Sequence, residues 1–120
     1  MAVTASARLT INGPDRNLPG TFGYGCVLLL EGVEAEHSLN RAAKSLGMAY
    51  SKAWRIVKEA EAQLGVTLLD RDGARGSALT PAGKQALAGY RTLQAEVDEL
   101  LQRRAPALFA WDKGAVPLSH

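Results

Sequence analysis

The basic side chains between Ser38 and Lys58 are the residues of this 120-residue chain best suited to chemistry with another molecule. This stretch holds five bases and no acid, whereas the whole chain holds 14 bases and 12 acids, a net charge of only +2. The five bases are Arg41, Lys44, Lys52, Arg55 and Lys58. Lysine and arginine donate hydrogen bonds to phosphates and to guanine edges, so the stretch is a candidate nucleic-acid surface. A solvated helix face that is basic by chance is the alternative.

Two helices joined by a glycine turn would hold these bases. A first helix fits Ser38–Ser45, with the serine at its start as N-cap, and Gly47 follows as the turn. A second helix fits the residues from Ala49 or Tyr50 to about Leu64, and it gathers its apolar residues on one face. The pattern predicts a helix-turn-helix whose second helix enters a DNA major groove. Its outer face would carry Ser51, Arg55 and Lys58, with Lys52 at the flank.

A short hairpin with arginines is expected directly after the second helix. Val66–Asp70 and Ser77–Thr80 are short extended segments on either side of a glycine-rich loop. Arg71 and Arg75 flank this loop, where they would reach the DNA backbone or the minor groove. A helix-turn-helix followed by such a hairpin is a winged helix-turn-helix. The alternative for the two arginines is a charge-balanced loop, because two aspartates lie in the same stretch.

A long helix follows the hairpin. Thr80 is its candidate N-cap, Pro81 suits the first helical position, and Pro106 should end it, which places a dimer helix at about 81–104. Its apolar residues include an alternating 3-4 spacing, which suits an antiparallel or coiled-coil pair of helices. We expect a homodimer interface at Leu87, Tyr90, Leu93, Val97, Leu100 and Leu101. Packing of this stripe on the first helix of the same chain is the alternative.

The whole chain fits one domain that is mainly α with a small β wing. Arg8–Asn12 predicts a short strand that ends in a turn, and Phe22–Glu36 predicts a buried helix. The expected architecture is a winged helix-turn-helix with a long C-terminal dimerisation helix. This domain would occupy residues 1–104, and residues 105–120 would form a C-terminal tail.

The other function classes lack the residues that they need. Cys26 is the single cysteine and lies in an apolar run, and the chain has only two histidines, His37 and His120. No disulfide, metal site or catalytic constellation is expected from this set, so we predict no enzyme activity and no cofactor. The chain also lacks a signal peptide and an apolar run long enough to span a membrane, which favours a cytoplasmic protein.

Residues 38–87, with the sequence SLNRAAKSLGMAYSKAWRIVKEAEAQLGVTLLDRDGARGSALTPAGKQAL, carry a resemblance to a known family. They resemble the amino-terminal DNA-binding domain shared by LysR-type regulators and ModE-type molybdate-responsive regulators. The preceding RLTINGPDRNLPGTFGYG and the SLNRAAKSLGMAYSKAW motif are more similar to the ModE type. The LTPAG at Leu79–Gly83, where the wing returns into the long helix, is shared by both types.

The resemblance implies a bacterial, sequence-specific transcriptional regulator that binds double-stranded DNA, with a palindromic operator expected for a homodimer. The recognition-helix contacts that it implies are Ala49, Tyr50, Ser51, Lys52 and Arg55. We add Lys58, the last basic residue of the same helix face. The wing contacts would be Arg71, Arg75 and Gly76. ModE-type regulators continue into molybdate-binding domains, for which this chain has no room, so we expect a standalone regulator without a molybdate site. The alternative function is a winged-helix interaction module that binds a protein partner or a small anion.

Overall fold

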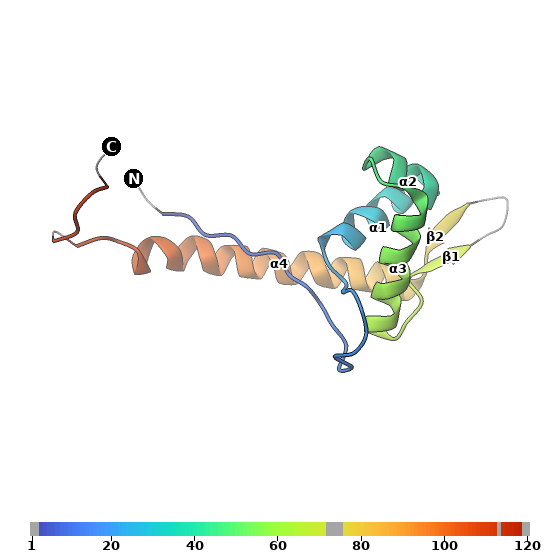
Figure 1. The fold of residues 1–120 in the computed structure, drawn as a ribbon, viewed down its shortest axis with the longest axis horizontal. Coiled ribbons are helices and arrows are strands. Elements are labelled where there is room, and N and C mark those ends of the chain that lie inside the picture. Colours follow the sequence, from blue (N-terminus) through green and yellow to red (C-terminus); the bar gives the residue numbers. More distant parts are fainter. Residues whose placement is uncertain (1–2, 72–75, 113, 119–120) are drawn as a thin grey trace.

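The structure is a computed structural model that describes residues 3–71, 76–112 and 114–118. In chain order its elements are α1 (Tyr24–Glu36), α2 (Leu39–Ser45), α3 (Tyr50–Leu64), β1 (Leu69–Arg71), β2 (Ser77–Leu79) and α4 (Pro81–Leu108). Figure 1 shows α1, α2, α3 and the β1–β2 hairpin gathered around one end of α4, whose other end projects away from this body. The molecule is therefore elongated, with extents of 65 × 32 × 25 Å.

The predicted helix-turn-helix is confirmed as α2 and α3. The Ser38 side chain accepts a hydrogen bond from the backbone N–H of Arg41 at 3.1 Å, as expected of an N-cap. Gly47 has φ +66° in the turn, and Gly65 has φ +72° as the C-cap of α3. Residues with a Cβ are disfavoured at such positive φ angles, so the backbone conformation favours glycine at both positions. The two helices begin and end where the sequence predicts.

The hairpin is antiparallel and short. Leu69 pairs with Leu79, and Arg71 pairs with Ser77. Leu69 and Leu79 are both buried, so this pair fixes the base of the hairpin to the core. The predicted wing is therefore present, three residues long on each side.

The N-terminal region differs from the prediction at two points. The expected strand over Arg8–Asn12 is reduced to one antiparallel bridge between Ile11 and Phe22, with backbone hydrogen bonds of 2.9 and 3.0 Å. This bridge holds Phe22 in extended backbone, so α1 begins two residues later than expected, at Tyr24. Phe22 is almost completely buried and forms part of the core. The helix itself supplies the largest share of the core, with Cys26, Val27, Leu29, Leu30 and Val33.

Helix α4 begins as predicted and ends later. Thr80 caps it, because its Oγ1 accepts from the Gly83 N–H at 2.9 Å and donates to the Thr67 carbonyl at 2.6 Å. The expected end before Pro106 is wrong, since α4 continues to Leu108. Proline removes one N–H donor and crowds the carbonyl four residues earlier, but only two helical residues follow Pro106, so a distortion there disturbs little of the helix. The predicted tail from residue 105 therefore starts after the helix end at Leu108.

The N-terminal segment runs along α4, from near the projecting end of that helix toward the body of the domain (Figure 1). Gln94 fixes this arrangement, because its Oε1 accepts from the Leu9 N–H at 3.2 Å and its Nε2 donates to the Ala7 carbonyl at 2.7 Å. The Tyr90 hydroxyl donates to the Leu9 carbonyl at 3.1 Å, and the Tyr90 ring packs edge-on against Phe22. One face of α4 is thus covered by its own chain.

Two residues of the predicted dimer interface lie on this covered face. Leu87 and Tyr90 are 1% and 5% exposed and belong to the core of the domain. Their assignment to an interface between subunits is therefore corrected, because the body of the domain and the N-terminal segment already occupy that side of the helix. Leu93 and Leu100 remain 43% and 47% exposed.

Candidate nucleic-acid interface

The outer face of α3 is the candidate interface, and it carries the residues that the sequence singled out. The apolar face of α3 packs into the core through Ala53, Val57 and Ala60, which are fully buried. The side chains on the other face are exposed, namely Ser51, Lys52, Arg55 and Lys58, and so are Ala49 and Tyr50 at the start of the helix. The predicted recognition residues therefore lie together on one solvent-facing surface.

Acidic side chains moderate the charge of this surface. Arg55 pairs with Glu59 one turn later at 3.2 Å, and Lys58 pairs with Glu61 at 3.1 Å. Lys58 also lies over the Trp54 ring, 4.4 Å from its centroid. The sequence reasoning missed both carboxylates, although their spacing of four and three residues on a helix was the signal that could have found them. Both bases remain at least half exposed, and ion pairs at the protein surface are weak, so the pairs leave the two basic groups accessible to solvent.

The wing is anchored to the end of α1. His37 ends α1 in the left-handed region, with φ 56°, and its carbonyl accepts from the Ser77 N–H at 2.9 Å. Gly76, one of the predicted wing contacts, has φ +97°, and a Cβ there would overlap the His37 carbonyl. Arg75 lies outside the described residues, and only the backbone of Arg71 is described. The hairpin is thus held to α1 at the loop end of β2, in addition to the buried pair at its base.

Glu61 holds α3 in place relative to the wing. Its Oε2 accepts from the Leu68 N–H at 2.7 Å and from the Leu69 N–H at 3.4 Å, at the entry to β1. Leu68 is fully buried beside this contact. The helix with the basic face and the hairpin therefore form one framework.

The comparison with protein families identifies this framework. Residues 27–84 match the model of the bacterial regulatory helix-turn-helix protein, lysR family. Residues 27–84 are a helix-turn-helix domain of the lysR family. The match runs from α1 to the first turn of α4, so it includes α2, α3 and the wing.

Solved structures support the fold of this lysR-family domain. The DNA-binding domain of BenM in complex with benA site 1 DNA has a TM-score of 0.52 and 28% sequence identity, covering 65% of this chain and 90% of that one. The same domain in complex with catB site 1 DNA has a TM-score of 0.53 and 23% identity, covering 72% of this chain and 94% of that one. Both neighbours are winged-helix domains, in agreement with the predicted fold.

Relatives in sequence carry the name ModE. The molybdenum transport protein ModE of Azotobacter vinelandii is 34% identical over 86 residues, which cover 68% of this chain and 32% of the relative. The protein of the same name from Herbaspirillum seropedicae is 34% identical over 80 residues, covering 63% of this chain and 30% of the relative. The chain thus spans about a third of the length of these relatives, and its lysR-family domain resembles the ModE type, as the motifs indicate.

Other chemical sites are sparse in the described part of the chain. Its residues include no group of His, Cys, Asp and Glu arranged to hold a metal ion. None of its helices combines the length and apolar character that crossing a bilayer requires. Cys26 is buried in the core, and burial, with a smaller contribution from the negative charge of Glu61, raises the pKa of its thiol from 9.0 to about 12.

The raised pKa makes Cys26 an unreactive thiol in the folded domain. At pH 8 the shift of the pKa lowers the thiolate fraction by about three orders of magnitude, and only the thiolate attacks a disulfide reagent. We expect Cys26 to react with dithionitrobenzoate about 1000-fold more slowly in the native protein than in urea-unfolded protein. Because the folded state disfavours the thiolate, its contribution to stability should fall as pH rises from about 9 to about 12. Equal reaction rates in the two states would contradict the buried placement.

Proposed function

We propose that this chain is a DNA-binding transcriptional regulator that reads its operator with α3 and steadies the complex with the wing. The observation that carries this proposal is the basic, exposed outer face of α3 within a lysR-family helix-turn-helix domain. A structural neighbour at 28% identity is bound to DNA, which favours DNA over a protein partner or a small anion. The test is a titration of promoter DNA at several salt concentrations, in which the affinity should fall steeply as salt rises.

The proposed division of roles follows from where each side chain lies. Ser51, Lys52 and Arg55 occupy the first turns of α3, where a helix inserted in the major groove meets base edges. Ala49, Tyr50 and Lys58 would flank these contacts. Arg71, Arg75 and Gly76 of the wing would meet phosphates or the narrow groove.

We also propose a homodimer formed by α4, bound to a palindromic operator. Leu93 and Leu100 are large apolar side chains left nearly half exposed on one side of α4, and Val97 and Leu101 beside them are half-buried. Pairing of two α4 helices along this stripe would remove the exposed apolar surface from water. Two copies would then present two α3 helices to two half-sites.

Arg55 gives the sharpest test of direct base recognition. Replacing Arg55 by alanine should cost about 1–3 kcal/mol on the best operator and flatten the preference at one or two base pairs. The loss should be smaller on random DNA, because the removed contact reads a base edge. Titrations of operator and random DNA with both proteins measure the difference.

Arg16→Ala is the matched control, because it removes the same charge from an exposed loop near the other end of α3. We expect this variant to bind the operator as the unchanged protein does. If Arg55→Ala lowers the affinity equally for operator and random DNA, Arg55 is an electrostatic anchor and the assignment to base recognition is wrong.

A further inference from the structure

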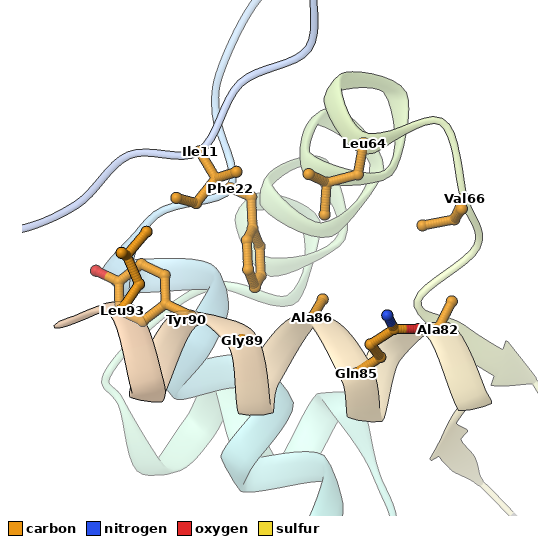
Figure 2. A pocket seen from close by; sticks show the side chains of 10 residues that line it. All are labelled: Ile11, Phe22, Leu64, Val66, Ala82, Gln85, Ala86, Gly89, Tyr90 and Leu93. Carbon is orange, nitrogen blue, oxygen red and sulfur yellow. The ribbon is translucent and has the colours of Figure 1, made fainter. Parts of the chain in front are cut away.

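An apolar pocket lies where α4 passes under the end of α3. Figure 2 shows Ile11 and Phe22 on one side of it, Leu64 and Val66 on the other, and α4 beneath them. Its volume is about 420 Å³, within the range of pockets that hold a ligand or a side-chain cluster. The α4 residues that line it are Ala82, Gln85, Ala86, Gly89, Tyr90 and Leu93.

The floor of this pocket continues the exposed stripe of α4. On a helical projection, Ala82, Ala86 and Gly89 share the face of Leu93 and Leu100. A Cβ built on Gly89 meets no atom within 4 Å, so the missing side chain leaves a recess in this face. The proposed dimer surface and the pocket therefore form one continuous apolar band.

A second apolar group lies at the opposite end of the same helix. Leu108 and Phe109 are 63% and 50% exposed, and Trp111 is 70% exposed. The rings of Phe109 and Trp111 pack edge-on, with centroids 5.9 Å apart. We call Leu108–Trp111 the aromatic tail. Exposed aromatic rings bury large areas when they find a partner, which makes the tail a candidate occupant.

We propose that the aromatic tail of one copy of this chain docks in the apolar pocket of a second copy, so that each subunit of the dimer holds the end of the other. This inference rests on the α4 dimer proposed above. It adds the register of that dimer, a defined occupant for the pocket, and a contact between each tail and the base of the partner's DNA-reading domain.

The tail cannot reach the pocket of its own chain. Leu108 lies 22 residues beyond Ala86 along one helix, a distance of about 33 Å. Trp111 follows the end of the helix by only three residues, which span at most about 10 Å. A tail in this pocket must therefore come from another copy.

Charge favours the antiparallel arrangement that brings the tail to the pocket. The seam would run through Leu93, Val97, Leu100 and Arg104, with the 4-3-4 spacing of paired helices. In a parallel pair, Arg104 would face the partner's Arg104. In an antiparallel pair, Glu96 lies near the partner's Arg103, and neither residue has an ion-pair partner within the described part of its own chain.

The register of such a pair seats the tail in the pocket. The register that we propose sets Val97 opposite the partner's Leu100, one of those that alternating 3-4 spacing allows. Gly89 then faces the partner's Leu108, whose side chain would fill the recess that the glycine leaves. The centre of the pair lies between Val97 and Leu100. Along the pair, the partner's Trp111 lies about 19–24 Å from this centre, depending on how extended the tail is. Ala86 and Ala82 of the facing helix lie about 19 and 25 Å from the same centre.

Cysteine cross-linking between two different chains tests this seating. One chain carries Gln85→Cys and the other carries Asp112→Cys, both at exposed positions beside the proposed contact. Oxidation of the mixture should give a disulfide-linked dimer, because the two positions face each other. Either chain alone should give none, because its two copies of the cysteine would be at least about 28 Å apart, whereas a disulfide needs Cα atoms within about 7 Å. The buried Cys26 thiol should not interfere.

Each outcome of the cross-linking decides the inference. If the unchanged protein sediments as a dimer and the mixture does not cross-link, the tail docking is wrong while the α4 dimer stands. If one of the two chains by itself cross-links to the same extent as the mixture, the helices are not in this register and the docking is also wrong. A protein that sediments as a monomer at micromolar concentration overturns both the dimer and the docking. Operator binding of the cross-linked dimer, measured separately, reports on DNA recognition alone.

Removal of the aromatic side chains gives an independent measurement. The double variant Phe109→Ser with Trp111→Ser should raise the dimer dissociation constant about 10-fold or more, because two rings per subunit lose their buried seat. The control is Val116→Ser with Leu118→Ser, two exposed apolar residues further along the same tail. Sedimentation equilibrium compares the two, and equal dissociation constants would overturn the proposal.

Discussion

Replacing Leu100 by glutamate should convert the dimer into monomers at micromolar concentration. Leu100 is 47% exposed on the free stripe of α4, where the proposed partner helix would cover it. Each new carboxylate would be withdrawn from water in the seam, where Arg104 one turn later on the same helix compensates it only in part, and burying a charge costs several kcal/mol. The dimer dissociation constant should rise by at least about 100-fold, measured by sedimentation equilibrium.

The same variant should lose most of its operator affinity, because a monomer contacts one half-site. The control is Ala95→Glu, which adds the same charge to an exposed position on the opposite side of α4. This control should dimerise and bind the operator normally. A Leu100→Glu protein that sediments as the unchanged dimer would rule out the α4 interface, while a monomer with full operator affinity would separate DNA recognition from dimerisation.

Replacing Gly83 by alanine should destabilise the domain by about 3 kcal/mol. Gly83 lies in the first turn of α4, and a Cβ there would overlap the carbonyl oxygen of Leu68, which is backbone in the core. Overpacking of this kind costs about 1–3 kcal/mol, and a shift of the helix start would also weaken the Thr80 cap, which is worth about 1 kcal/mol. Urea unfolding at one fixed chain concentration measures the change.

Gly25→Ala is the matched control for this prediction. Gly25 lies in α1, and a Cβ built there meets nothing within 4 Å. Alanine should therefore fit without strain and stabilise the protein by about 0.5–1 kcal/mol, because glycine gives up more chain freedom on folding. Equal stabilities of the two variants would mean that α4 can move away from Leu68 at little cost.

The helix-turn-helix and its caps were predictable because their causes are local. Ser38 and Thr80 cap helices through side chains that bond backbone groups three residues away, and Gly47 and Gly65 supply angles that other residues avoid. Each of these signals is contained in a few consecutive residues. The position of the basic face on α3 followed in the same way from helical periodicity.

The surroundings of α4 were not predictable from the same signals. The apolar spacing of the helix is the same whether its stripe packs within the chain or against a second copy. Tyr90 and Leu87 went to the core because the N-terminal segment and α1 lie against that side, and this depends on contacts between residues more than 80 positions apart. In the candidate site, the anchoring of the wing to the end of α1 was not predictable either, because the hydrogen-bonded residues Ser77 and His37 are 40 positions apart.

The bonds between the N-terminal segment and α4 also constrain how the chain is made. Leu9 and Gln94 are 85 residues apart in sequence, yet they are hydrogen-bonded partners in the finished domain. Translation emits about 5–20 residues per second, so residues 7–9 wait several seconds before their partners exist. The helix-turn-helix can form from local contacts during that interval. Residues 7–9 are therefore made before the helix-turn-helix but dock after it has formed, and their docking closes a loop of 85 residues between Leu9 and Gln94.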